Sequence, residues 1–285
     1  MKHKYALGMY EKAVPADLSW KEKLTAAKDA RYDFMEVSID ETDEKLSRLD
    51  MTKTELRRII DAQFETELPI RSLCLSAHRK YPLGSNDPKI EAKSLEIMEK
   101  SLEFSAKIGV RVIMLAGYDV YYETSTEETV LRFGRNLEKC VEMASRSGII
   151  LAFETMETPF MNTTEKAMNY VNKINSAFLS VYPDIGNINN AAITYGNDVL
   201  DDLKKAQGHI VGLHLKETVP GKFRDMMYGQ GIVDFPSAIK TAWEMGVRRY
   251  VTEFWYLGEA DWKERLSFAR KTMGNLLDIQ EKRAT

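Results

Sequence analysis

Short apolar runs alternate with longer amphipathic stretches from one end of the chain to the other, and this alternation restricts the fold more than any other feature. The runs are short and rich in Val, Ile, Leu and aromatic residues, which is the pattern of parallel strands covered on both faces. Eight strands alternating with eight helices predict a single (β/α)8 barrel; a doubly wound open sheet is the alternative, but it rarely needs eight units. The predicted strands are Tyr5–Met9, Phe34–Ile39, Ile70–Leu75, Val112–Leu115, Ile149–Phe153, Leu179–Tyr182, Ile210–Leu215 and Tyr250–Phe254.

The stretches between the runs carry the start and stop signals of helices. The helix predicted over Pro88–Ile108 follows Asp87, a capping residue, and ends before Gly109. A second long helix is predicted over Thr126–Ser147, which is also followed by a glycine. The sequence contains two candidate capping boxes, Thr52-x-x-Glu55 and Ser125-x-x-Glu128. In a capping box a hydroxyl and a carboxylate three residues apart each accept a backbone amide hydrogen at the start of a helix.

No Pro/Gly/Ser-rich linker or low-complexity tract interrupts the sequence, so the prediction is one barrel domain over residues 1–285. The chain is 44% apolar and 29% charged, which suits a large buried core and differs from disordered or fibrous sequences. Its formal net charge of −3 argues against a general binder of nucleic acid or membrane surfaces. An anionic substrate would therefore need local cations to hold it.

Cysteine usage and the N-terminus indicate the cellular compartment. Cys74 and Cys140 both fall within apolar periodic segments, where small buried side chains are expected rather than a disulfide or a metal pair. The N-terminus lacks the apolar core of a signal peptide, and no stretch of about 18 apolar residues occurs anywhere. We therefore expect a soluble protein of the reducing cytoplasm.

The connections at the two ends of the predicted barrel differ in length. Connections that lead into strands, such as 109–111, are short, whereas four that follow strands are long and polar. In a parallel barrel the active site forms where the strands end, so this asymmetry favours an enzyme over a binding scaffold. The long loops are Ser76–Asp87, Gly117–Ser125, Thr155–Thr163 and Lys216–Asp234.

Four residues, Glu154, Asp184, His214 and Glu253, each directly follow a short apolar run, in steps of 30, 30 and 39 residues. Neighbouring parallel strands end at the same edge of a sheet, so the four side chains are expected to converge. Three carboxylates and one imidazole suit one divalent metal ion, with Zn²⁺ and Mn²⁺ accepting both kinds of ligand. The two glutamates would also be available as bases.

Each of these four residues also has an ordinary structural explanation. Glu154 and Glu253 could be solvated acids at strand ends, Asp184 a turn residue and His214 a hydrogen-bonded histidine of the core. Four such residues at corresponding strand ends are hard to explain by coincidence, and together they predict the metal site.

Several motifs surround the four residues. The short ones are Phe153-Glu154, Pro183-Asp184-Ile185-Gly186-Asn187, Leu213-His214-Leu215-Lys216, Gly229-Gln230-Gly231 with Asp234-Phe235, and Thr252-Glu253; the longer ones are LCLSAHRKYPLGS from Leu73, LAGYDVYYE from Leu115 and ETMETPFMN from Glu154. Through these motifs the chain resembles, over essentially its whole length, the xylose-isomerase-like barrels. Within them it most resembles the L-xylulose-5-phosphate 3-epimerases of ascorbate utilisation, also described as hexulose-6-phosphate isomerase-like.

The resemblance implies an enzyme that epimerises a ketose phosphate at C3, converting L-xylulose 5-phosphate to L-ribulose 5-phosphate. In such enzymes the carbonyl and a neighbouring hydroxyl chelate the metal, which polarises the carbonyl and stabilises an enediolate. Glu154 and Glu253 would bind the metal and also act as acid and base, one removing the C3 proton and the other delivering a proton to the opposite face. A dimer is common among such enzymes, so a homodimer is one expectation for this chain.

A sugar phosphate needs cations for its phosphate and polar side chains for its hydroxyls. Arg79, after the third strand, and Arg224, after the seventh, are the candidates for the phosphate, although surface loops carry arginine routinely. His78 is a candidate for a substrate hydroxyl, with a structural hydrogen bond as the alternative. Lys216 lies two residues past His214, so on a continuing strand it would share the inward face.

Three further residues are candidates for the pocket that binds the substrate. Glu157, three residues after Glu154, could bind hydroxyls or face solvent. Asn187 falls where sugar epimerases that act without a phosphate often carry histidine, and this departure leaves its role as a substrate contact open. Trp255, two residues after Glu253, could form a pocket wall or pack beside the strand.

Three other functions compete with the epimerase. An aldose–ketose isomerase could use the same metal and bases to move a proton between C1 and C2. A DNA-repair endonuclease with several zinc ions would need more than the four histidines of this chain, and the net acidic charge argues against DNA. A non-catalytic sugar- or metal-binding barrel would not need two opposed glutamates. The sequence therefore favours the epimerase.

Overall fold

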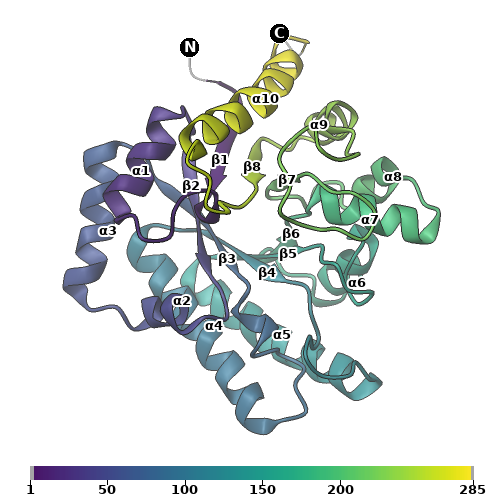
Figure 1. Ribbon diagram of the computed structural model, residues 1–285. Coiled ribbons are helices and arrows are strands. Elements are labelled where there is room, and N and C mark those ends of the chain that lie inside the picture. Colours follow the sequence, from purple (N-terminus) through teal and green to yellow (C-terminus); the bar gives the residue numbers. More distant parts are fainter. Residues whose placement is uncertain (1–2, 284–285) are drawn as a thin grey trace.

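Eight parallel strands form the centre of the protein in a computed structural model, which describes residues 3–283 (Figure 1). Each strand pairs with the next along the chain except the sixth, which forms no ladder with the seventh, and the first pairs with the last. Two isolated bridges, Val181–Ile210 and Asp184–His214, connect the sixth strand region to the seventh and close the barrel. The strands are β1 (Ala6–Tyr10), β2 (Phe34–Ile39), β3 (Ile70–Leu75), β4 (Val112–Ala116), β5 (Ile150–Glu154), β6 (Leu179–Val181), β7 (Leu213–Lys216) and β8 (Arg249–Glu253).

Helices follow every strand and cover the outside of the barrel, as the alternation predicted (Figure 1). Two short helices, α2 and α8, are additional to the eight predicted ones. The α-helices are α1 (Trp20–Asp29), α2 (Asp43–Ser47), α3 (Lys53–Thr66), α4 (Pro88–Ile108), α5 (Glu127–Ser147), α6 (Thr164–Ile174), α7 (Ile185–Tyr195), α8 (Val199–Lys204), α9 (Phe235–Glu244) and α10 (Trp262–Arg283), and the 3₁₀ turns are η1 (Glu11–Ala13), η2 (Arg48–Asp50) and η3 (Ala77–Arg79).

The helix signals in the sequence are confirmed except for one capping residue. Helix α4 has the predicted bounds, with Asp87 as its N-cap, and the Thr52-x-x-Glu55 box caps α3. The Ser125-x-x-Glu128 box is wrong, because the hydroxyl of Ser125 donates to Asp119 Oδ2 at 2.7 Å. Thr126 caps α5 instead, accepting from the backbone amide of Thr129.

Strand β7 is shorter than predicted and begins at Leu213 rather than at Ile210. Gly212 packs so closely against the ring of Tyr182 that a side chain there would collide with it. The chain therefore passes this ring as irregular backbone, and Ile210 contributes only its single bridge. The predicted strands over Phe34–Ile39 and Ile70–Leu75 match β2 and β3 in full.

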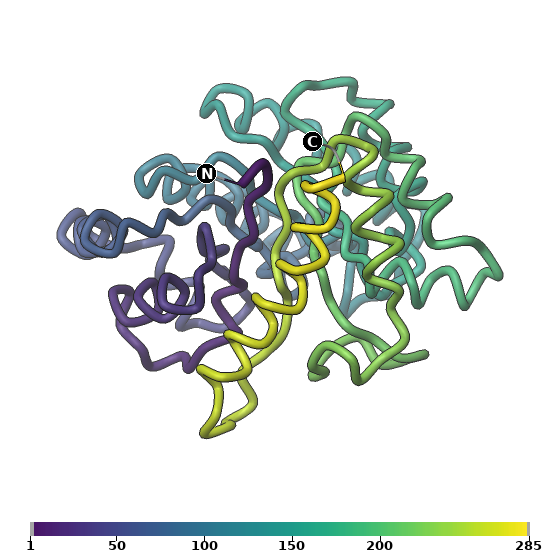
Figure 2. The backbone as a smooth tube through the Cα atoms, turned by 90° about the horizontal axis from the view of Figure 1, so that it is seen from above, coloured from purple at the N-terminus to yellow at the C-terminus, as the bar shows by residue number. Residues whose placement is uncertain are grey.

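The two ends of the described chain lie side by side, with α10 crossing next to the segment that leads into β1 (Figure 2). Tyr5 donates to Asp278 Oδ1 at 2.6 Å, which ties the first residues to the last helix. Cys74 and Cys140 are buried and free, as predicted. Among the described helices, none combines the length and the apolar character needed to cross a membrane.

Candidate metal and substrate site

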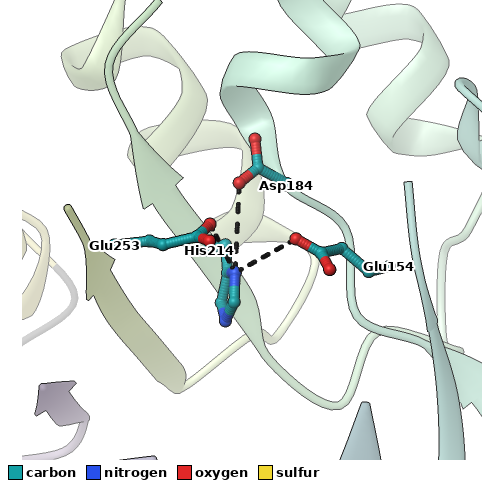
Figure 3. Close-up of side chains that lie close together, drawn as sticks. All are labelled: Glu154, Asp184, His214 and Glu253. Carbon is teal, nitrogen blue, oxygen red and sulfur yellow. Dashed lines mark hydrogen bonds and ion pairs between the residues drawn. The ribbon is translucent and has the colours of Figure 1, made fainter. Parts of the chain in front are cut away.

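The four predicted ligands meet at the end of the barrel where the strands finish (Figure 3). Glu154 and Glu253 are the last residues of β5 and β8, His214 lies within β7, and Asp184 follows β6 as the N-cap of α7. All four are buried, and one ligand atom from each lies within 4.8 Å of the others. The parallel register of the strands therefore produces the predicted cluster.

The imidazole of His214 stands at the centre of the three carboxylates (Figure 3). Its Nδ1 lies 2.8 Å from Glu253 Oε2, 3.5 Å from Glu154 Oε1 and 3.9 Å from Asp184 Oδ2. The two glutamates approach this nitrogen from opposite sides (Figure 3). The cluster therefore offers one nitrogen and three oxygens around a common point.

Asp184 divides its two oxygens between the fold and the site. Oδ1 accepts a hydrogen bond of 2.7 Å from the backbone amide of Asn187 and so caps α7. Oδ2 is buried and has no hydrogen bond, although Lys216 Nζ lies 3.0 Å away as an ion pair. Three buried carboxylates converge here beside the single ammonium group of Lys216, so a further cation would offset their charge and the donor set fits a divalent metal ion.

The buried charges of the cluster shift one another's protonation. Burial raises the pKa of Asp184 to about 7, an effect that Lys216 opposes and Glu253 reinforces. Burial also disfavours charge on Glu253, but Lys216 and His214 outweigh it and lower its pKa. For His214, burial is again outweighed, and Glu36 and Glu253 raise its pKa well above the ordinary value. The site concentrates negative charge that needs a cation.

Glu36 belongs to this site and was not predicted from the sequence. Its side chain is fully buried, and Oε1 lies 2.6 Å from His214 Nε2, on the far side of the ring from the other carboxylates. Oε2 accepts a hydrogen bond of 2.6 Å from Ser72. The sequence did contain a sign of this role, because Glu36 is the one carboxylate within the otherwise mostly apolar strand β2.

A pocket opens above the cluster and contains most of the predicted substrate residues. Arg79, Glu157, Asn187, Lys216 and Arg224 all line it, together with Trp255. The remaining lining residues are Tyr10, Lys12, Cys74, Ser76, Glu154, Met156, Phe223 and Glu253. Lys12 was missed because it follows the first strand, where no long loop drew attention to it.

Two arginines and an acid form the outer part of this pocket. Arg79 donates to Tyr118 Oη at 3.2 Å, and Tyr118 donates to Glu157 Oε2 at 2.5 Å. Glu157 Oε1 lies 3.9 Å from Arg79 Nη2 and 3.8 Å from Arg224 Nη2. The guanidinium of Arg224 also lies over the ring of Trp255, at 5.9 Å from its centroid. These contacts orient two cations toward one pocket.

Lys216 and Asn187 are joined at the inner part of the pocket. Lys216 Nζ donates to Asn187 Oδ1 at 2.9 Å, and Asn187 Nδ2 donates to the carbonyl oxygen of Thr155 at 2.7 Å. Asn187 therefore links the loop after β5 to β7. The amide already has a partner at each end, so its first role is to fix Lys216 beside the carboxylates.

His78 does not join the pocket, and the interpretation of it as a hydroxyl ligand needs correction. His78 is part of η3, and its buried side chain faces α4, where Nε2 lies 3.1 Å from the carbonyl oxygen of Ser94. Burial lowers the pKa of His78 to about 4, so the ring is neutral at pH 7. The structural hydrogen bond, which was the alternative, is the arrangement present.

Glu217 organises the loop that carries Arg224. Its buried carboxylate accepts backbone hydrogen bonds of 3.2, 3.0 and 3.1 Å from Thr218, Gly229 and Val233. Both ends of the loop after β7 are therefore fixed to one side chain. This is why an arginine far along that loop still lies over the pocket.

Comparisons with known proteins agree with this architecture. Residues 24–272 match the family model described as xylose isomerase-like TIM barrel. The chain is 45% identical over 250 residues to L-ribulose-5-phosphate 3-epimerase UlaE of Escherichia coli O139:H28, covering 87% of each chain. It is 44% identical to the protein of the same name from Salmonella heidelberg, with the same coverage.

A solved structure extends the likeness of fold. The D-allulose 3-epimerase from Methylomonas sp. superposes with a TM-score of 0.78 at 18% identity, covering 96% of this chain and 99% of the other. At this identity the likeness concerns the fold alone, whereas the family model and the curated relatives establish kinship. The chain therefore belongs to the L-ribulose-5-phosphate 3-epimerase family within the xylose isomerase-like TIM barrels.

Proposed function

We propose that this protein is a metal-dependent 3-epimerase of a ketose phosphate, interconverting L-xylulose 5-phosphate and L-ribulose 5-phosphate. The observation that carries the proposal is the pair Glu154 and Glu253, which face the imidazole of His214 from opposite sides (Figure 3). Inversion of a carbon needs one group to remove a proton and another to supply one on the opposite face. The relatives that share 45% identity carry the matching name.

Glu154, Asp184, His214 and Glu253 would hold the metal, with zinc and manganese as the ions that suit this donor set. When bound, the ion supplies a Lewis acid that polarises the ketose carbonyl and stabilises negative charge next to it. One glutamate takes the proton from C3, and the other donates a proton to the opposite face. Lys216, 3.8 Å from Glu253 Oε2, helps to keep that carboxylate ionised and ready to act as a base.

The phosphate end of the substrate would lie among the outer cations of the pocket. Arg79 and Arg224 are the candidates predicted from the sequence, and Lys12 is a third cation on the same lining. Lys12 pairs with Asp40 at 2.5 Å, whereas the side chain of Arg224 is 45% exposed and its ion pair with Glu157 is long, at 3.8 Å. Arg224 is thus the cation with the most freedom to meet a phosphate, while Glu157 and Trp255 would contact the sugar.

The direct test is turnover of defined sugars. Metal-loaded protein incubated with L-ribulose 5-phosphate is expected to form L-xylulose 5-phosphate, followed by ¹³C NMR, and a chelator should stop the reaction until Zn²⁺ or Mn²⁺ is restored. Free L-ribulose should react far more slowly, because it leaves the arginines unpaired. Formation of an aldose phosphate in place of the epimer would support the aldose–ketose isomerase, and no product with either sugar would refute the proposed activity.

We infer a cytoplasmic location from the two free buried cysteines and from the phosphorylated substrate, which cells retain inside. We also propose that the protein forms a homodimer, which analytical ultracentrifugation would detect as twice the mass of one chain.

A further inference from the structure

Glu36 is a buried acid that the proposed reaction does not use. It lies in the middle of β2, with none of its surface exposed, and its chain position is 178 residues from the histidine that it contacts. Among the described residues, the only ion pair recorded for Glu36 is the one with His214. Burying a charged carboxylate costs free energy unless a partner compensates it. The contact between Glu36 and His214 is therefore expected to have a role in the site.

The two nitrogens of His214 face different groups. Nδ1 points toward Glu154, Asp184 and Glu253, whereas Nε2 lies 2.6 Å from Glu36. A neutral imidazole has one N–H and one lone pair, and an ionised carboxylate can only accept. Nδ1 also lies 2.8 Å from Glu253 Oε2, so with no metal bound each ring nitrogen can donate to a carboxylate. A metal ion held among Glu154, Asp184 and Glu253 would take the place of the hydrogen on Nδ1, and Nε2 would keep the hydrogen that Glu36 accepts.

We propose that Glu36 is a positioning residue that fixes His214 in the Nε2–H tautomer, so that Nδ1 is the atom that binds the metal. The inference rests on the metal site of the proposed function. It adds that Nδ1 is the atom of His214 that binds the metal and that the carboxylate of Glu36 selects this atom. A carboxylate that accepts a hydrogen bond from Nε2 also makes Nδ1 more basic and so a stronger ligand for the metal. Ser72, which donates to Glu36 Oε2 at 2.6 Å, holds the acid in turn.

The tautomer can be observed directly in the unmodified protein. The sequence has four histidines, so ¹⁵N-histidine labelling gives a spectrum simple enough to assign. In the protein loaded with ¹¹³Cd²⁺, the expected result is coupling between cadmium and Nδ1 of His214, with a slowly exchanging proton on Nε2. Coupling to Nε2 would overturn the inference while leaving a metal site in place. Failure to bind Cd²⁺ or Zn²⁺ at all would refute the metal site of the proposed function as well.

A variant tests the contribution of the carboxylate. Glu36→Gln retains the size of the side chain but removes the charge, and its Zn²⁺ affinity, measured by competition with a chromogenic chelator, should fall about 10–100-fold. Asp119→Asn is the control, because Asp119 is also a buried acid, but its carboxylate accepts from the hydroxyls of Ser125 and Thr129 and does not line the pocket. The control should bind Zn²⁺ within about twofold of the wild type; a Glu36→Gln affinity equally close to the wild type would contradict the role of Glu36.

Discussion

Single residues at the strand ends determine what this barrel can do. The convergence of Glu154, Asp184, His214 and Glu253 was predictable because a residue's place at the end of a buried strand also fixes which edge of the sheet it occupies. Glu36 and His78 were not predictable in the same way. The role of Glu36 depends on its contact with His214, and the role of His78 depends on its contact with the Ser94 carbonyl. Spacing along the chain does not show which groups meet in the interior.

The two glutamates can be assigned to the two faces of the substrate by isotope exchange. Glu154→Gln and Glu253→Gln should each lower kcat by about 10²–10⁴-fold, the range for loss of a general acid or base. Each variant retains one glutamate, so it should exchange the C3 hydrogen with solvent in only one of the two epimers. The Glu154 variant and the Glu253 variant should act on opposite epimers. Glu165→Gln, at an exposed position of α6, is the control. Normal turnover in either variant would remove that glutamate from proton transfer.

Recognition of the phosphate is testable at Arg224. Arg224→Ala should raise KM for the ketose phosphate about tenfold or more, since a hydrogen bond to a charged group contributes roughly 1.5–3 kcal/mol. The slow reaction of the unphosphorylated ketose should be little affected. Lys222→Ala is the matched control, because Lys222 is exposed on the same loop but does not line the pocket. Equal effects on both sugars would show that Arg224 does not bind the phosphate.

At the scale of elements, a buried ion cluster holds the first part of the barrel together. Glu11, in η1 directly after β1, accepts from Lys23 at 2.9 Å, from Lys45 at 2.8 Å and from Arg48 at 2.8 Å. It thereby joins α1, α2 and η2, and its bond from the amide of Ser38 adds β2. Sequence periodicity predicted the large elements but not α2, because five residues are too few to show a helical period.

Glu11→Gln should destabilise the fold by about 3–5 kcal/mol at pH 7, because it leaves buried cations without their anion. Burial opposes the charge on Glu11, but Arg48, Lys45 and Lys23 lower its pKa well below the ordinary value. An acid with a lowered folded-state pKa stabilises the protein above its unfolded pKa of about 4.3, and this contribution is lost as pH falls further. The difference between variant and wild type should therefore be constant from pH 7 to 5 and shrink below about 4.

Urea denaturation at several pH values measures this difference. Glu103→Gln is the control, because Glu103 is exposed and its ion pair with Lys107 within α4 is worth less than about 0.5 kcal/mol. A Glu11→Gln variant as stable as this control at pH 7 would mean that the cluster does not join these elements.

At the scale of the molecule, the barrel was predictable because each strand and helix unit is a local pattern repeated eight times, and closure follows from repetition. The loops were not predictable in detail. Glu217 reaches three backbone amides along a loop of irregular conformation, and no periodic signal marks such contacts. Those loop contacts place Arg224 over the pocket, so the inner cluster of carboxylates and His214 could be predicted better than the outer part of the pocket.

A metal ion that bridges β5, β6, β7 and β8 should stabilise the whole barrel. A ligand that binds only the folded state adds about 2.7 kcal/mol at a hundred times its Kd, so chelation should lower Tm by several degrees and Zn²⁺ should restore it. His214→Ala should lose this metal-dependent shift. A Tm that does not respond to chelation or to added Zn²⁺ would contradict a metal bound across these strands.

The central claim is proton transfer at C3 by two opposed glutamates, and solvent exchange tests it most directly. Metal-loaded protein and L-ribulose 5-phosphate are incubated in D₂O, and the position of deuterium is read by NMR and mass spectrometry. We predict that the L-xylulose 5-phosphate formed carries one solvent deuterium at C3 and none at C1. Deuterium at C1, or an epimerised product that keeps its original C3 hydrogen, would contradict the account.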